Sequence, residues 1–237
     1  MSKLDTLARF LSEARRAVFF GGAGVSTESG IPDFRSPGGL YSEAPETIVS
    51  RSFFLAHPEE FYRFYRERML YPEAEPGPAH LALAALERMG HLRAVVTQNI
   101  DGLHQRAGSR LVLELHGSVH RNHCVRCGRR YPLQAVLESE GLPRCACGGL
   151  IRPDVVLYEE PLPAGVFERA EALVRGADLL LVGGSSLTVY PAAGLLQYYR
   201  GSRLVLLNRT PTPADGRADL VLRGSIGAVL SAAVARL

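Results

Sequence analysis

Residues 17–30 read AVFFGGAGVSTESG, an apolar run that passes directly into a glycine-rich turn. Glycines let a backbone turn tightly and approach a phosphate, and the amides that begin a following helix offer it hydrogen-bond donors. However, Thr27 stands where the Gly-x-Gly-x-x-Gly fingerprint of dinucleotide-binding proteins has its third glycine, and no second strand ends in an acid about twenty residues later. An ordinary dehydrogenase is therefore disfavoured, and a glycine turn without a ligand stays open for this motif alone.

Further short apolar runs lack polar alternation, which is typical of strands buried on both faces of a parallel sheet. They lie at residues 93–96, 111–115, 155–158, 179–182, 203–207 and 220–222. Segments of helical period lie at residues 4–14, 58–69, 78–89, 164–174, 192–199 and 226–235. This alternation of strand and helix predicts an α/β fold with a doubly wound, Rossmann-like parallel sheet.

Two stretches interrupt this rhythm and predict a second, smaller domain. Residues 36–76 contain several aromatics and an arginine-rich helix without a convincing strand, and residues 118–153 contain the cysteines. We expect a helical module at 36–76 and a zinc-ribbon module at 118–153, which together form the small domain. The discontinuous large domain would consist of residues 1–35, 77–117 and 154–237.

Composition narrows the class of protein. The 237 residues are 46% hydrophobic and 22% charged, values that fit a globular chain with a sizeable core. A net charge of +3 implies no strong general affinity for polyanions, and Lys3 is the only lysine among 27 basic residues. The apolar runs are too short to span a membrane, and residues 1–20 lack the apolar core of a secretory signal, so we expect a cytoplasmic protein.

All four cysteines lie between residues 124 and 147, which in a cytoplasmic protein suggests a metal site more than disulfides. Cys124 and Cys127 form one close pair, and Cys145 and Cys147 form another. Two such pairs match a four-cysteine zinc ribbon, in which the protein supplies all four tetrahedral ligands and the metal is structural. The Cys-x-Cys spacing is less common than Cys-x-x-Cys, and disulfides or redox thiols are the alternative.

Polar residues follow several predicted strands, at the edge where open α/β sheets bind ligands. Residues 30–35 (GIPDFR) follow the glycine turn, and residues 97–104 (TQNIDGLH) follow the strand at 93–96. His116 follows the strand at 111–115, where a histidine is well placed as a general base. A surface salt bridge, helix capping and a structural histidine are the alternatives for each set alone, but their convergence on one edge favours a site.

In combination these motifs resemble the sirtuins, a family of NAD-dependent protein-lysine deacylases. The matching segments occur in the family's order over essentially the whole chain: residues 22–26 (GAGVS), 30–35, 97–101 (TQNID), His116-Gly117, the four cysteines, residues 184–187 (GSSL), residues 189–192 (VYPA) and Asn208. The resemblance implies NAD as cosubstrate, one structural zinc ion, and acetylated lysine-containing proteins as partners. Neither a specific nucleic acid nor a membrane is expected as a partner, and a monomer is the expected state.

The resemblance also implies roles for individual residues. His116, as general base, and Asn99 would be catalytic. NAD would be bound by Gly22, Ala23, Gly24, Asp33, Phe34, Arg35, Gln98, Asn99, Ile100, Asp101, Gly184, Ser185, Ser186, Asn208 and Ile226. The acyl-lysine peptide would lie as an added strand between two segments, and its contacts would be Val155, Val156, Leu157, Tyr158, Leu187 and Val189.

Two departures from the family's pattern concern the substrate. Tyr158-Glu159-Glu160 stands where the family usually has Phe-Gly-Glu, so this loop loses a glycine. The branch that removes acidic acyl groups resembles Tyr-x-x-Arg, and here Tyr62 and Tyr65 occupy the matching positions. The missing arginine predicts a preference for acetyl groups.

The resemblance therefore implies a deacetylase that transfers the acetyl group of acetyl-lysine to ADP-ribose and releases nicotinamide. Two other functions stay open. One is a protein mono-ADP-ribosyltransferase, because the first chemical step would be the same. The other is a non-enzymatic zinc ribbon that binds nucleic acid through Arg121, Arg126, Arg129, Arg130, Arg144 and Arg152.

Overall fold

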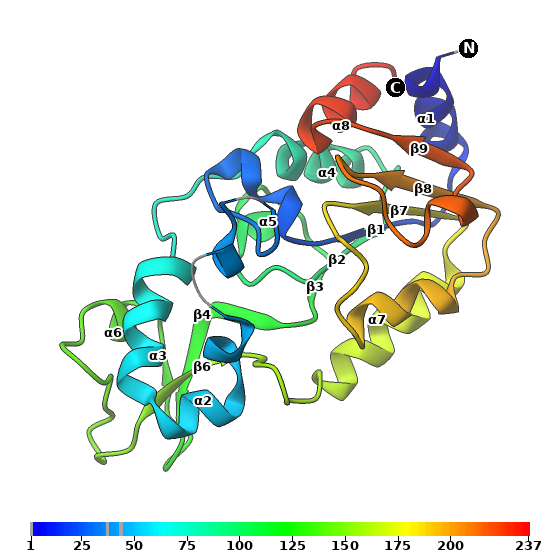
Figure 1. Cartoon of the computed structure of the whole chain (residues 1–237). Helices are drawn as coiled ribbons and strands as arrows, with labels where there is room; N and C mark the ends of the chain where they lie inside the picture. Colours follow the sequence, from blue (N-terminus) through cyan, green and yellow to red (C-terminus); the bar gives the residue numbers. More distant parts are fainter. Residues whose placement is uncertain (1, 37, 43–44) are drawn as a thin grey trace.

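A six-stranded parallel sheet forms the centre of the larger part of the molecule in the computed structural model (Figure 1), which describes residues 2–36, 38–42 and 45–237. The strand order is β3-β2-β1-β7-β8-β9. These strands are β1 (Ala17–Gly21), β2 (Ala94–Thr97), β3 (Val112–Glu114), β7 (Leu179–Gly183), β8 (Arg203–Leu207) and β9 (Leu220–Leu222). The chain builds the sheet outward from β1 in one direction and from β7 in the other. The switch point of this topology therefore lies between β1 and β7, which pair in parallel.

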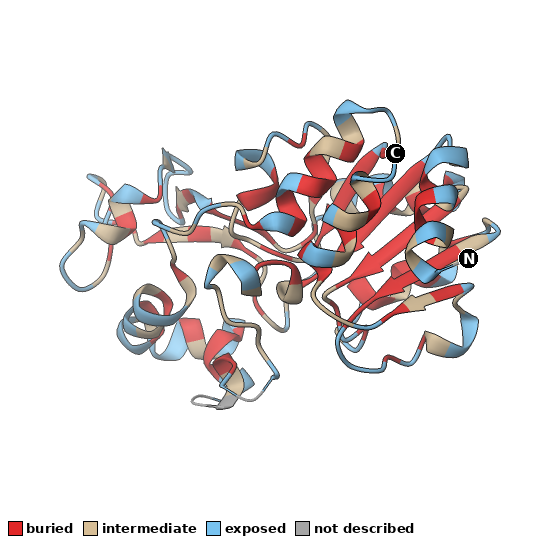
Figure 2. Cartoon of the chain, turned by 90° about the horizontal axis from the view of Figure 1, so that it is seen from above, coloured by how far each residue is buried: buried red, intermediate tan, exposed pale blue. Residues whose placement is uncertain are grey.

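Helices cover both faces of this sheet, and Figure 2 shows the buried strands in red between them. Every residue of β1 and β7 is buried, because successive side chains enter two different apolar cores. One core lies under α1 (Lys3–Glu13), α4 (Pro78–Arg88) and α8 (Ile226–Val234), and the other lies under α7 (Ala164–Gly176) and the 3₁₀ helix Ala192–Tyr198. The predicted doubly wound α/β class is confirmed.

The smaller part of the molecule is built on an antiparallel sheet in the order β5-β4-β6. Its elements are β4 (Gly117–Cys124), β5 (Arg130–Tyr131), β6 (Ile151–Val155), α2 (Arg51–Ala56), α3 (Pro58–Phe64), a π-helical turn (Tyr65–Met69) and α6 (Gln134–Leu137). A third apolar core joins Phe54 and Phe61 from the helices to Val119 and Ile151 from the sheet. A separate core favours a division into two domains, whose boundaries stay a prediction. Val155, on the large-domain side of the predicted boundary between 153 and 154, belongs to β6 and to this core.

Residues 155–158 were expected to form a strand of the large sheet, and this expectation is wrong. β6 ends at Val155 and pairs antiparallel with β4, and beyond it Tyr158 forms an isolated bridge with Ser50. The cause is Gly117, which has φ +78° and where a Cβ atom would lie 1.8 Å from the Asp154 carbonyl oxygen. The chain therefore turns directly from His116 into β4, and β6 pairs with β4 in the small sheet.

The remaining short elements lie mainly near the carboxyl edge of the large sheet. They are α5 (Leu103–Arg106) and the 3₁₀ turns Ala23–Val25, Thr27–Ser29, Leu40–Ser42, Glu46–Val49 and Asp215–Arg217. The segment predicted as a helix at 192–199 is 3₁₀-helical. Among the residues that the structure describes, no helix is both long enough and apolar enough to cross a bilayer.

Candidate active site

One cavity of about 540 Å³ lies where the carboxyl ends of β1, β2 and β7 meet the small sheet. Every residue predicted above to bind NAD or peptide, and the predicted base His116, lines this cavity, except Leu187. Leu187 is buried in the core that covers one face of the large sheet. The structure thus brings the predicted site residues together from segments that are up to two hundred residues apart in sequence.

The glycine turn lies at the switch point of the sheet, against the end of β7. The Gly22 amide donates to the Gly183 carbonyl oxygen at 3.2 Å, and the Gly24 amide donates to that of Gly184 at 2.9 Å. A Cβ atom on Gly22 would lie 2.8 Å from the Gly184 carbonyl oxygen. The glycines are therefore needed for the close approach of the two loops. Both loops line the cavity, where together they form a cradle for a ligand.

A buried polar chain fixes the residues that follow β2. The Gly77 amide donates to His80 Nδ1 at 3.2 Å, so the ring proton of neutral His80 lies on Nε2, which is 3.4 Å from Ser26 Oγ. Ser26 Oγ donates to Asp101 Oδ2 at 2.6 Å and accepts from Asn99 Nδ2 at 3.0 Å. Burial lowers the pKa of His80, an effect that the charge of Asp101 opposes. Asn99 and Asp101 are thus held in one orientation at the cavity.

Sequence reasoning assigned no role to Ser26 or His80. Ser26 was part of a quoted motif, but nothing in its position indicated that it joins Asn99 to Asp101. His80 is fully buried in α4. It is the single polar residue in the stretch AHLALAAL of that helix, and this is the signal that could have identified it. His104, also buried, packs against the His80 ring with centroids 4.8 Å apart.

His116 has a defined tautomer. Its Nδ1 lies 2.9 Å from the Gln98 carbonyl oxygen, which only accepts hydrogen bonds, so Nδ1 carries the proton of the neutral ring. Nε2 then keeps its lone pair. Burial lowers the pKa of His116 from its ordinary value of 6.5, and the hydrogen bond to Gln98 opposes this shift. The imidazole is therefore neutral near pH 7 and able to accept a proton at Nε2.

Residues that follow β7 and β8 extend the cavity along the sheet. Gln98 Nε2 donates to Ser185 Oγ at 2.9 Å, and Asn208 Nδ2 donates to the Ser185 carbonyl oxygen at 2.6 Å. The Glu28 carboxylate accepts from the Gly227 amide at 2.9 Å and from the Ser225 hydroxyl at 2.7 Å, which places Ile226 beside the glycine turn. These bonds make the floor of the cavity one connected surface that suits an elongated ligand with hydroxyl groups.

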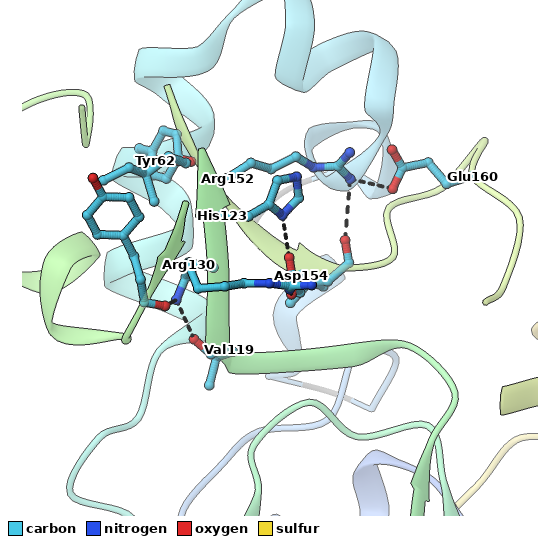
Figure 3. A network of polar contacts seen from close by, with 11 residues as sticks. Tyr62, Val119, His123, Arg130, Arg152, Asp154 and Glu160 are labelled. Carbon is cyan, nitrogen blue, oxygen red and sulfur yellow. Dashed lines mark hydrogen bonds and ion pairs between the residues drawn. The ribbon is translucent and has the colours of Figure 1, made fainter. Parts of the chain in front are cut away.

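The loop after β6 is fixed by its two glutamates. Glu160 Oε2 accepts from Arg152 Nη2 at 2.5 Å and from the Leu157 amide at 3.0 Å, and Figure 3 shows the Arg152 contact. Glu159 adopts φ +73°, a conformation that side chains rarely take, and its carboxylate accepts from the Ser52 amide and hydroxyl at 2.9 and 2.8 Å. This contact at the start of α2 offsets the loss of the glycine that the family usually has here.

Below this loop, charged side chains tie the three strands of the small sheet together. Asp154 on β6 accepts from His123 on β4, as Figure 3 shows, and from Arg130 next to it on β5, at 2.7 Å. β4 and β6 thus keep a fixed spacing at the point where their ends, Gly117 and Val155, reach the cavity.

The aromatic pair discussed for acyl selectivity lies away from the site. Tyr62 and Tyr65 are fully buried in the core of the small domain, and the Tyr62 hydroxyl donates to the Ile151 carbonyl oxygen. Neither is among the described residues that line the cavity, whereas Arg68 and Met69 from the π-helical turn are. The preference for acetyl groups stays a prediction.

The four cysteines form a candidate zinc site. Their Sγ atoms all lie within 4.8 Å of one another, with Cys124 and Cys147 at 3.5 Å and Cys127 and Cys145 at 3.6 Å. Four thiolates at Zn–S distances of about 2.3 Å in a tetrahedron are roughly 3.8 Å apart, whereas a disulfide needs about 2.05 Å. The Sγ positions therefore fit one structural zinc ion.

A tyrosine adjoins this cluster. Tyr131 on β5 donates its hydroxyl proton to Cys145 Sγ at 3.0 Å. The Cys147 amide and this hydroxyl lower the pKa of Cys145 to about 6, which favours the thiolate that zinc requires.

Comparison with known proteins gives a consistent result. The model of the Sir2 family matches residues 22–191. An NAD-dependent protein deacetylase of Clostridium perfringens is 56% identical over 236 residues, covering 96% of this chain and 97% of that protein. One from Thermotoga maritima is 46% identical over 226 residues, covering 92% of each.

Solved structures agree with these relatives. A Sir2 protein with a p53 peptide and NAD+ has a TM-score of 0.88 and 44% identity, covering 97% of this chain and 96% of its own. Another, with a deacetylated p53 peptide and 3′-O-acetyl ADP-ribose, has a TM-score of 0.92 and 43% identity, covering 98% and 97%. The fold, the cavity and the four thiols thus define a protein of the Rossmann-like, dinucleotide-binding class whose cysteines fit one structural zinc ion. The chain belongs to the Sir2 family.

Proposed function

We propose that this protein is an NAD-dependent protein-lysine deacetylase. The observation that carries this conclusion is the position of His116. Its Nδ1 is fixed by the Gln98 carbonyl oxygen, and it shares one cavity with the glycine turn and with the loop after β6. A base with a free Nε2 between a dinucleotide cradle and a peptide segment is what transfer of an acyl group from lysine to a ribose requires.

The residues of the chain divide the work of this reaction. NAD supplies the ADP-ribosyl group, with nicotinamide as the leaving group. The carbonyl oxygen of acetyl-lysine bonds to the ribose carbon as the bond from that carbon to nicotinamide breaks. His116 then removes a proton from a ribose hydroxyl, whose oxygen attacks the former amide carbon, and the carbon–nitrogen bond to lysine breaks as the amine takes up a proton and leaves. A water molecule then adds to the acyl carbon, which still bridges two ribose oxygens, and releases one of them, so that the products are lysine and O-acetyl-ADP-ribose. Asn99 and Asp101, held by Ser26, orient the ribose and nicotinamide. Positioning and exclusion of water supply most of the rate enhancement in such a site.

The remaining predicted residues complete the binding proposal. We infer that Ala23, Asp33, Phe34 and Arg35 bind the phosphates and the nicotinamide ribose, and that Ser185, Ser186, Asn208 and Ile226 bind the adenosine half. The backbone of the acetyl-lysine peptide pairs between residues 155–157 and Val189, which line the cavity. Since Leu187 is buried and does not line the cavity, we infer that it supports the shape of the part that binds the peptide.

The activity should show an acidic limb below pH 6.5. His116 accepts a proton when neutral, and because burial lowers its pKa, the neutral form accumulates as the pH rises through a value below 6.5. We expect kcat/KM for an acetyl-lysine peptide to rise through such a midpoint and then to level off at higher pH. The measurement is a pH series of initial rates at saturating NAD. A midpoint above 6.5 would contradict the assignment of the base.

The fate of NAD distinguishes the deacetylase from a mono-ADP-ribosyltransferase, which would share the first chemical step. For the deacetylase, we expect release of nicotinamide to depend on an acetylated peptide and the radiolabel of NAD to appear in a small molecule. Release without acetylated peptide, with label retained on protein, would favour the transferase instead.

The arginines of the zinc module give little support to nucleic-acid binding. Arg121 pairs with Glu114 at 2.8 Å, Arg130 with Asp154 at 2.7 Å and Arg152 with Glu160 at 2.5 Å, so half of this set is neutralised by acids. We propose acetylated proteins as the partners, with neither nucleic acid nor membrane, and a monomeric state. A cytoplasmic location belongs to the same proposal, since four reduced thiols as zinc ligands suit a reducing compartment.

A further inference from the structure

Tyr158 ends the segment proposed to pair with the peptide, and its backbone is fixed in place. Its amide donates to the Val49 carbonyl oxygen at 3.1 Å, and its carbonyl oxygen accepts from the Arg51 amide at 3.0 Å. The flanking glutamates are anchored to Ser52 and Arg152, as described above. The phenol therefore extends from a rigid base, and it lines the cavity.

The Tyr158 hydroxyl contacts the loop that follows the glycine turn. It accepts from Arg35 Nη2 at 3.2 Å and from the Tyr41 hydroxyl at 3.2 Å. Arg35 Nη2 also donates to Glu46 at 2.7 Å, and its guanidinium lies 5.3 Å from the centre of the Tyr41 ring. Arg35 is thus held by three side chains, of which Tyr158 alone belongs to the segment proposed to bind the peptide.

The loop itself places Tyr41 and Arg35 on the same side. The Leu40 amide donates to the Asp33 carbonyl oxygen and the Tyr41 amide to that of Phe34, both at 2.9 Å. The Phe34 and Tyr41 rings pack with centroids 5.3 Å apart. The position of Arg35 therefore depends on side-chain contacts at its tip, because its side chain is 40% exposed and an unheld arginine has many rotamers.

We propose that Tyr158 is a positioning residue that holds Arg35 toward the phosphates of NAD through its hydroxyl group. This inference rests on the proposed function. Arg35 would already have the orientation in which it binds NAD. The conformational entropy of its side chain is therefore lost before the ligand arrives, and this loss does not weaken binding.

The test is calorimetric binding of ADP-ribose to the full chain, which needs no turnover. For Tyr158→Phe we expect the Kd to rise about fivefold, as for the loss of one partly exposed hydrogen bond to a charged group. In an Arg35→Ala background the same substitution should change the Kd by less than about 1.5-fold, because the hydroxyl acts through Arg35. Tyr198→Phe, which removes the same atom from a half-buried tyrosine outside the cavity lining, is the matched control.

Kinetics give a second readout. Tyr158→Phe should raise the KM for NAD by a similar factor while kcat and the melting temperature stay near those of the parent protein. An unchanged or tighter Kd for ADP-ribose, or an equal effect in the Arg35→Ala background, would overturn the inference and leave the proposed function intact. If the parent protein binds no ADP-ribose, the proposed function itself fails.

Discussion

Replacing His116 with alanine is expected to lower kcat for deacetylation by about 10²- to 10⁴-fold, the range for loss of a general base. The His116 Nε2 lone pair is available because the Gln98 carbonyl oxygen fixes the proton on Nδ1. The substitution leaves the three apolar cores intact, since none of them includes His116, whose partly buried ring bonds a backbone oxygen. Binding of ADP-ribose and the melting temperature should therefore change little.

Steady-state rates with an acetyl-lysine peptide, together with ADP-ribose calorimetry, check this prediction. His91→Ala, a histidine in the turn between α4 and β2, is the control and should keep the parent rate. An His116→Ala protein with more than about a tenth of the parent kcat would refute the role of His116, because general-base catalysis contributes at least about 10²-fold.

Replacing Cys127 with serine is expected to abolish zinc binding and deacetylation together. Structural zinc contributes about 10–16 kcal/mol to folding in small zinc modules, far more than a module of this size gains from its apolar core. The core of the small domain includes Cys124 and Cys145 as well as Val155. Loss of the metal would therefore disorder β4 and β6, whose ends form one wall of the cavity.

The measurements are metal content by mass spectrometry, thermal unfolding and activity. We expect about one zinc per chain in the parent protein and none in Cys127→Ser, with activity below detection. Tyr131→Phe is the matched variant, because it keeps all four thiols and removes the hydrogen bond to Cys145. It should retain zinc but release it to a chelator about tenfold faster. A zinc-free Cys127→Ser protein with parent activity would contradict a structural role of the metal.

The sequence was informative where burial is uniform. Apart from Thr97 at the end of β2 and Arg203 at the start of β8, the residues of β1, β2, β7 and β8 are apolar because both faces are covered, so their runs identified the parallel sheet to within a residue or two. Residues 98–101 and His116 could be placed at the cavity because they follow predicted strands, and parallel strands bring their carboxyl ends to one edge. The residues proposed for the adenosine half and for the peptide came from the family resemblance.

The small domain was less predictable, for two physical reasons. β4 reads GSVHRNHC, and some of its polar side chains bond across the small sheet, as His123 does with Asp154, which no apolar pattern reveals. The apolar residues 155–158 looked like a buried strand, but their cover comes from the helical module and the loop to α7. The Ser26–His80 contact joins residues 54 positions apart, so nothing near His80 in the sequence indicates its partner.

The most direct test of this account is mass spectrometry of an acetyl-lysine peptide incubated with the protein, with and without NAD. The account predicts loss of the acetyl group only when NAD is present, with equal amounts of nicotinamide and O-acetyl-ADP-ribose formed and no ADP-ribose left on peptide or protein. Deacetylation without NAD, or an ADP-ribosylated protein beside an unchanged peptide, would contradict it.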